Sequence, residues 1–151
     1  MSVKTTSFWT GALIAGALDI SYAIGISYVL RGTLPSRILK SVASGWLGSD
    51  ALNGGAGIAA LGLASHFLIA IIWTAIYFAA ASKIDALWKK PAIFGPLYGI
   101  LIYGAMNYVV IPLSAIGRVT VTPNIFMVYG ILVHMFLIGL VMALFARKAY
   151  R

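Results

Sequence analysis

Four polar side chains stand inside long apolar segments of this 151-residue sequence, and their types are the ones that could do chemistry: Asp19, His66, Asn107 and His134. A carboxylate beside two imidazoles can hold and pass a proton, because each group shifts the protonation of the others. Two imidazoles on facing helices can also serve as the axial ligands of a haem. Both chemistries require the fold to bring these residues together, so the elements that position them come next.

The composition indicates that these elements are membrane-spanning helices. Apolar residues make up 62% of the sequence and charged residues only 9%, compared with about 25% charged residues in soluble domains, and the mean hydropathy is +0.99. Four runs match the roughly 20 apolar residues that a helical span needs: 8–30, 57–82, 93–116 and 125–146. The sequence predicts an all-α membrane protein, with residues 1–151 forming a single domain of four transmembrane helices.

Several residue types that enzymes use are missing. The sequence has no cysteine and no glutamate, and Asp19 is the one aspartate inside an apolar run. Iron–sulfur clusters, thiolate metal sites and paired-carboxylate catalysis are therefore excluded. Ser65 adjoins His66, but adjacent positions of a helix do not face each other. The sequence favours a protein that is not an enzyme, with no catalytic residues and no metal ligands apart from the two histidines if a haem is bound.

The two halves of the sequence align as an internal repeat, and chance similarity between apolar segments is the alternative. The stretch GALIAGALD, which ends at Asp19, returns 88 positions later as GILIYGAMN, which ends at Asn107. The stretch GLASHFLIA likewise aligns with GILVHMFLI, which places His66 on His134, 68 positions later. We interpret the chain as two tandem helical hairpins related by a pseudo-twofold axis along the membrane normal, as in parallel-repeat transporters.

Small residues accompany the polar ones. In membrane proteins such residues mark helix faces in close contact, and we expect the helices to pack through them: Gly11, Gly16, Gly62, Gly95, Gly99, Gly104 and Gly130. An ionised carboxylate at mid-bilayer costs roughly 3 kcal/mol on insertion scales, so such a group is paired or lines a cavity. We therefore interpret the four polar residues as one polar cluster near the membrane midplane, pointing into the bundle or toward a partner subunit.

The long connection after the first run carries a helical pattern over about 34–47. Its apolar residues recur at helical spacing, and basic and hydroxyl residues fill the opposite face. Pro35 suits a first turn, and Gly48 suits a C-terminal cap. We expect a short interfacial helix with Trp46 at the level of the lipid headgroups. An irregular loop is the alternative.

The basic residues divide unevenly between the two ends of the runs. The end that holds both termini has seven: Lys4, Lys83, Lys89, Lys90, Arg147, Lys148 and Arg151. The other end has four: Arg31, Arg37, Lys40 and Arg118. Since cytoplasmic loops carry the excess of basic residues, we expect both termini to be cytoplasmic. The net charge of +8 is thus explained by the topology of the spans. No basic stretch of the sequence indicates nucleic-acid binding.

Three functions remain open. The first is an accessory or assembly subunit of unestablished activity, in which the polar cluster forms an interhelical hydrogen-bond network that fixes helix register. The second is a small transporter or proton-relay protein that uses Asp19. The third is a b-type haem protein with His66 and His134 as ligands. Four thin, glycine-rich helices enclose little volume, so we also expect a homo-oligomer or a larger membrane complex.

Three motifs resemble a widespread family of small four-span bacterial inner-membrane proteins of unknown function: GALIAGALD ending at Asp19, ILKSVASGWLG ending at Gly48 and MNYVVIPLS ending at Ser114. The resemblance covers most of the chain. It implies residence in the bacterial cytoplasmic membrane and no particular reaction. It also implies that Asp19 and Asn107 are more regular features than His134, which weakens the haem alternative.

Overall fold

The computed structural model describes residues 2–117 and 123–151, and every secondary-structure element within them is helical. Four spans are long and apolar enough to cross a membrane, which confirms the prediction of a helical membrane protein with four candidate spans. Two of these spans are single helices, α1 (Val3–Arg31) and α3 (Ala56–Ala81). Arg118, one of the basic residues counted above, lies outside the described residues.

The third and fourth spans each contain a π-helix, in which backbone hydrogen bonds reach five residues back along the chain. Ile111 N–H bonds to Met106 O in the third span, and Leu140 N–H bonds to Met135 O in the fourth. The third span consists of α5 (Pro91–Ala105), η2 (Met106–Val110) and α6 (Ile111–Leu113). The fourth consists of α7 (Ile125–Val133), η3 (His134–Gly139) and α8 (Leu140–Tyr150).

Capping residues set the length of α1, which begins five residues before the predicted apolar run. The hydroxyl of Ser2 accepts a hydrogen bond from Thr5 N–H at 3.2 Å, so the polar first turn is stabilised by its cap and not by hydropathy. The helix ends where Gly32 adopts a left-handed conformation, with φ of 63°, which glycine accepts without steric cost. Hydropathy alone therefore understates the span.

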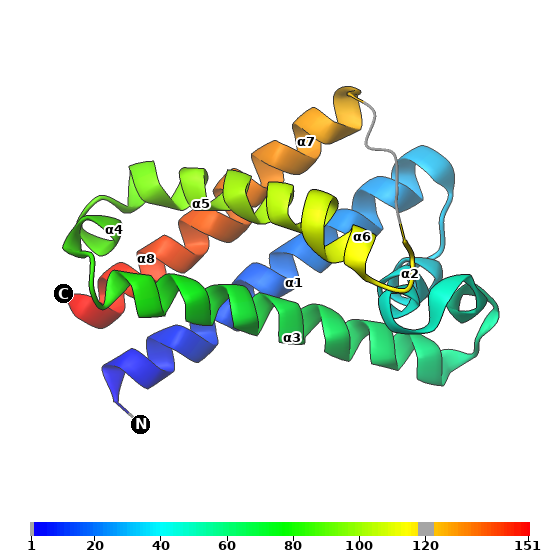
Figure 1. The fold of residues 1–151 in the computed structure, drawn as a ribbon, viewed down its shortest axis with the longest axis horizontal. Helices are drawn as coiled ribbons and strands as arrows, with labels where there is room; N and C mark the ends of the chain where they lie inside the picture. The colour runs from blue at the N-terminus through cyan, green and yellow to red at the C-terminus, as the bar shows by residue number, and fades with distance from the viewer. Residues whose placement is uncertain (1, 118–122) are drawn as a thin grey trace.

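The helices are tied together at the end that holds both termini (Figure 1). There α1 packs against α3 and α8, and the short helix α4 (Asp85–Lys89) links α3 to α5. The core at this end consists of buried side chains from α3 and α8: Tyr77, Phe78, Ala81, Ala143, Ala146 and Ala149. Two tyrosine hydroxyls fasten it, since Tyr77 Oη donates to Leu87 O at 2.9 Å and Tyr150 Oη donates to Phe78 O at 3.0 Å.

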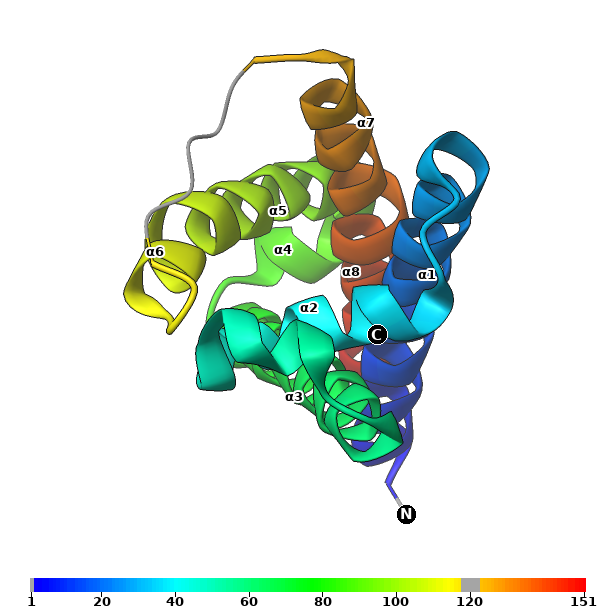
Figure 2. The same cartoon turned by 90° about the vertical axis from the view of Figure 1, so that its right-hand side faces the viewer.

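The bundle opens toward its other end. Near its middle, α5 still touches α3, where Tyr98 Oη donates to Trp73 O at 2.7 Å and the Tyr77 and Tyr98 rings lie 4.8 Å apart. Beyond this point α6 stands away from α3, as the turned view shows (Figure 2). A second, smaller core fills the bundle between the closed end and the open end: Ala15, Ile102, Ile138 and Met142. The polar cluster lies just beyond that second core.

Glycine allows the closest helix contact, between α5 and η3. A Cβ atom added to Gly99 would lie 2.0 Å from His134 O, and one added to Gly139 would lie 2.1 Å from Gly95 O. The predicted packing positions Gly11, Gly16, Gly62, Gly95 and Gly130 are also within 3.0 Å of a neighbouring atom by the same measure. At Gly62, Gly95, Gly99 and Gly139 the nearest atom belongs to another backbone, whereas at Gly11, Gly16 and Gly130 it belongs to an aromatic side chain that packs on the glycine.

Gly104 is a correction to the predicted set, because a Cβ atom there would meet nothing within 4 Å. The contact stripe of α5 follows helical spacing from Gly95 and Gly99 to Tyr103, whose ring packs on Gly130. Gly104 is one residue off that stripe, and so it faces away from the neighbouring span. The repeat pairs it with Gly16, but the two glycines have different surroundings.

The predicted helix after the first span is present as α2 (Pro35–Leu47), followed by the 3₁₀ helix η1 (Gly48–Asn53). It crosses α3 closely, since a Cβ atom on Gly62 would lie 1.8 Å from Leu39 O. Trp46 Nε1 donates to Ser65 Oγ at 3.0 Å and fixes the crossing. One end of α2 thereby covers the open end of the bundle beside α3 (Figures 1 and 2).

Candidate functional site

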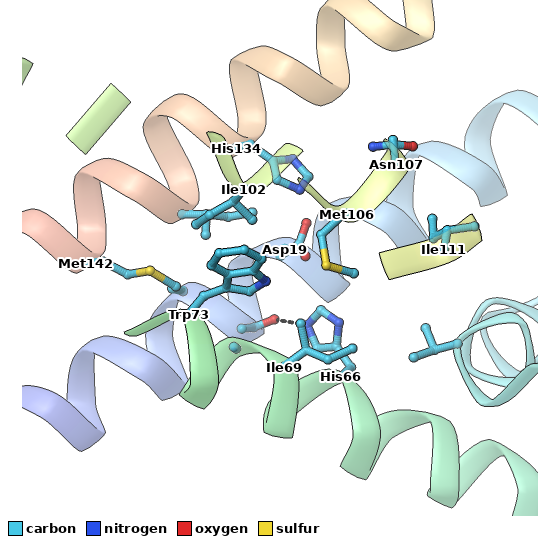
Figure 3. A pocket seen from close by; sticks show the side chains of 15 residues that line it. Asp19, His66, Ile69, Trp73, Ile102, Met106, Asn107, Ile111, His134 and Met142 are labelled. Carbon is cyan, nitrogen blue, oxygen red and sulfur yellow. Dashed lines mark hydrogen bonds between the residues drawn. The ribbon is translucent and has the colours of Figure 1, made fainter. Parts of the chain in front are cut away.

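A cavity of about 240 Å³ lies where the bundle begins to open, and all four predicted polar residues line it: Asp19, His66, Asn107 and His134 (Figure 3). They come from α1, α3, η2 and η3, so each of the four spans contributes one. The rest of the lining is apolar and includes Val42 of α2, Ile69 and Trp73. The fold thus brings together residues that are up to 115 positions apart in the sequence.

The cavity is closed on the side of the termini. Ile102, Ile138 and Met142 are buried there as part of the second core, and Trp73 lies beside them in the lining (Figure 3). Because α3 runs toward the termini, Trp73 is two helical turns nearer that end than His66. Water and solutes therefore have their shorter route to the cavity from the opposite, open end.

Asp19 makes no hydrogen bond and no ion pair among the described residues, and no lysine or arginine lines its cavity. It lies 12 residues before the end of α1, or roughly 18 Å at 1.5 Å per residue. The position is well inside the span, where an unpartnered carboxylate is costly and marks a functional group. Asp19 is therefore the one acidic side chain available to bind a proton or a cation from the cavity.

His66 bonds across the bundle. Its Nε2 lies 2.8 Å from Gly16 O on α1. A carbonyl oxygen only accepts hydrogen bonds, so Nε2 carries the hydrogen, and Nδ1 is the acceptor when the ring is neutral. The ring also packs edge-on against Phe67, with centroids 5.6 Å apart. His66 thus joins α3 to α1 one turn from Asp19.

The two polar residues of the second hairpin bond to their own spans. His134 Nδ1 donates to Gly130 O at 2.8 Å, and Asn107 Nδ2 donates to Tyr103 O at 2.9 Å. By the same reasoning His134 Nε2 and Asn107 Oδ1 are acceptors when the imidazole is neutral. Both residues lie in π-helices, which occur frequently at functional sites. Asp19 and His66, in contrast, lie in regular α-helix.

The predicted network of direct hydrogen bonds between the four residues does not form within the described structure. Each of the three that bonds does so to a backbone carbonyl, and only the bond of His66 crosses between spans. The four side chains instead line one shared cavity of about 240 Å³.

A haem does not fit between His66 and His134. His134 suits ligation, because its Nδ1–H bonds a backbone carbonyl and leaves Nε2 free. His66 leaves Nδ1 free instead, since its Nε2 donates to Gly16 O. The obstacle is size: the cavity of about 240 Å³ is below the roughly 300 to 1,000 Å³ of sites for drug-sized ligands, and a porphyrin is larger than such ligands. No group of three potential metal-ligating side chains occurs among the described residues either.

Sequence reasoning missed two features of the site. One is Val42, which brings α2 into the cavity lining, and the amphipathic pattern of that helix alone gave no partner. The other is the pair of π-helices. Pro112 follows η2 closely, and a proline that lacks an N–H distorts the preceding turn of a helix, so this signal could have located η2. The sequence of η3 carries no comparable signal.

Comparisons of the chain with family models, curated proteins and solved structures gave no match. The function proposed below therefore rests on the geometry of the cavity.

Proposed function

We propose that this protein is a small membrane transporter or proton relay in which Asp19 binds and releases a proton in the central cavity. The observation that carries the proposal is the position of Asp19: it is the one acidic side chain in the spans, it has no partner in the part of the chain that the structure describes, and it faces a chamber shared with two imidazoles. Ionisable residues placed in this way mark proton relays and substrate paths in membrane proteins.

The neighbouring groups have distinct roles in this proposal. The free ring nitrogens of His66 and His134 accept protons and pass them to or from the Asp19 carboxylate, since an imidazole nitrogen without a hydrogen is an acceptor. Asn107, with its Oδ1 free, positions water in the chamber without titrating. The apolar wall formed by Trp73, Ile102 and Met142 restricts the passage of water and protons toward the end with the termini. Proton exchange is therefore easier with the opposite side of the membrane.

We also propose a membrane placement for the chain. Seven basic residues lie at the end with the termini, whereas Arg31, Arg37 and Lys40 are the described ones at the other end. This excess supports cytoplasmic termini, and the family resemblance supports a bacterial cytoplasmic membrane. In that placement α2, which crosses α3 at the open end (Figure 2), lies as an interfacial helix on the non-cytoplasmic side, with Trp46 exposed toward the headgroups.

The two hairpins support a tandem-repeat origin, with α1 packed on α3 and α5 packed on η3 and α8. The repeat is uneven at the site, because the π-helices occur only in the second hairpin within the described residues. Less than a quarter of the most apolar window of each span is buried inside one chain. The remaining surface supports association into a homo-oligomer or with another membrane subunit. An accessory or assembly role would use this surface.

Proton flux into liposomes tests the proposal. The purified protein is reconstituted around an entrapped pH-sensitive dye, a potassium ionophore clamps the membrane potential, and the outside pH is lowered abruptly. We expect wild-type protein to acidify the lumen at least tenfold faster than Asp19→Asn protein, which should match empty liposomes. Asp85→Asn makes the same chemical change outside the spans and should behave as wild type. Equal rates for wild type and Asp19→Asn would refute the proposal.

A further inference from the structure

Two further cavities, of about 440 and 520 Å³, lie between α3 and the end of the third span beneath α2. Val42 and Ile69 line all three spaces, and Met106 and Ile111 line both the central cavity and the first of the two. The three spaces therefore adjoin one another at these side chains. We refer to the two outer spaces together as the side groove, and to the central cavity and the side groove together as the path.

The side groove opens sideways into the region that lipid occupies. Its outer rim consists of Leu68 and Ile72 of α3 and Leu113 of α6, which are 49%, 48% and 82% exposed. Its far end is bridged, because Ala115 N–H donates to Gly45 O at 2.9 Å. A molecule dissolved in the bilayer can thus reach the cavity between α3 and α6 without passing through the headgroup layer.

The wall of the side groove is apolar in practice. No charged residue lines it. Its four serine hydroxyls all donate to carbonyls of their own segments: Ser41 to Ile38, Ser44 to Ser41, Ser65 to Leu61 and Ser114 to Ile111. Such a lining suits a hydrocarbon chain, which needs no hydrogen-bond partners.

The inner end of the path suits a positive charge. Among the described residues Asp19 has no hydrogen-bond or ion-pair partner, and no lysine or arginine of this part of the chain lines the cavity to satisfy it or to attract an anion. Trp73 adds an aromatic ring to the same cavity, and indole faces attract ammonium groups. A head group of a few heavy atoms fits the space of about 240 Å³.

From this combination we infer that the path binds an amphiphilic cation, an amine or quaternary ammonium with a single apolar tail, which enters from the bilayer. Its head lies against Asp19 and Trp73, and its tail lies in the side groove along Val42, Ile69 and Val110. The inference deepens the proposed function by naming the class of substrate that shares Asp19 with the proton, and it rests on that function.

Dodecyltrimethylammonium is the probe that tests the inference, because its charge does not depend on pH. Binding of the radiolabelled compound, below its micelle concentration, is measured on protein in lipid nanodiscs, with empty nanodiscs as background. We expect saturable binding of one molecule per chain. Asp19→Asn should weaken binding at least tenfold, and Asp85→Asn should leave it unchanged. Val42→Phe, which fills the junction of the three spaces, should weaken binding at least tenfold.

Competition identifies the occupant. Tetramethylammonium, which lacks the tail, should compete at least tenfold more weakly than the labelled compound, and dodecyl sulfate should not compete. Equal competition by dodecyl sulfate would show a groove for lipid chains of any charge and would overturn the inference, as would equal binding to Asp19→Asn protein.

The sequence has no cysteine, so Leu113→Cys offers a single thiol. Crosslinking of two Leu113→Cys chains at high yield would show that a second copy covers the groove, and would also overturn it.

The flux assay separates the two proposals. Wild-type flux without binding of the probe would remove the amphiphilic cation and leave the proton function standing. Absence of flux from wild-type liposomes would remove the proton function itself.

Discussion

The imidazole Nε2 of His66 lies 2.8 Å from the carbonyl oxygen of Gly16, and this bond fastens α3 to α1 beside the central cavity. His134 lines the same cavity, yet its Nδ1 bonds to Gly130 O within its own span. The same residue type thus has an interhelical role at His66 and a local role at His134. The difference leads to separate predictions for the two histidines.

His66→Ala should destabilise the protein more than His134→Ala. The first substitution removes a hydrogen bond between spans, and such bonds contribute about 0.6 kcal/mol on average and up to about 1.7 kcal/mol. The second removes a side-chain hydrogen bond to Gly130 O within the same span, and no contact between two spans is lost with it. The free energy of unfolding, measured by denaturant titration in mixed micelles, gives the comparison. A larger loss for His134→Ala would contradict the assignment of His66 as the interhelical tie.

Gly99→Ala and Gly104→Ala form a matched pair on the third span. A Cβ atom on Gly99 would lie 2.0 Å from His134 O, whereas one on Gly104 would meet nothing. We expect Gly99→Ala to cost about 1 to 3 kcal/mol, as overpacking does, and to displace His134 from the cavity. Gly104→Ala should be neutral or stabilising by up to about 1 kcal/mol, because alanine favours helix more than glycine. Thermal denaturation of both variants checks this, and equal melting temperatures would be inconsistent with the packing described here.

Asp85 predicts a pH effect outside the membrane. The Lys89 ammonium, 2.6 Å away, donates a hydrogen bond that holds the pKa of the Asp85 carboxyl below its ordinary value of 3.8. Because the folded-state pKa is lowered, the stabilisation of α4 is complete above pH 3.8 and is lost as the pH falls through the lowered pKa. Trp88 Nε1 also donates to this carboxylate at 3.3 Å, so tryptophan fluorescence can report the change.

Wild-type protein should show a fluorescence transition with its midpoint below pH 3.8, and Asp85→Asn protein should lack it. Both should have the same melting temperature at pH 7, because the pair is exposed and screened by solvent. A midpoint above pH 3.8 would mean that the ion pair does not hold in solution.

The four apolar spans and the residues of the cavity could be predicted from the sequence because both depend on simple patterns. Composition and run length locate membrane helices, and polar residues inside such runs must face away from lipid. That reasoning leads to Asp19 and His66 without a structure. Their shared cavity then follows from the depth at which each occurs in its span.

The open end of the bundle, the contact of α2 with the cavity and the hydrogen bonds of the histidines could not be predicted, since they depend on how the spans pack. The open end of the bundle exists because bulky buried residues such as Tyr77 and Phe78 gather at the other end, and no local pattern shows that imbalance. The contact of Val42 with the cavity depends on the angle at which α2 crosses α3. His66 bonds to another helix and His134 bonds to its own. Which of the two occurs depends on the side-chain rotamer that the packing around each histidine allows.

Infrared titration shows directly whether Asp19 exchanges protons with water. The sequence has only three acidic side chains, Asp19, Asp50 and Asp85, so an Asp50→Asn/Asp85→Asn variant leaves Asp19 as the one side-chain carboxyl. We predict that the C=O stretching band of a protonated aspartic acid appears as the pH of this variant is lowered, and that the added Asp19→Asn substitution removes it. A spectrum in which that band neither changes with pH nor depends on Asp19 would contradict the claim.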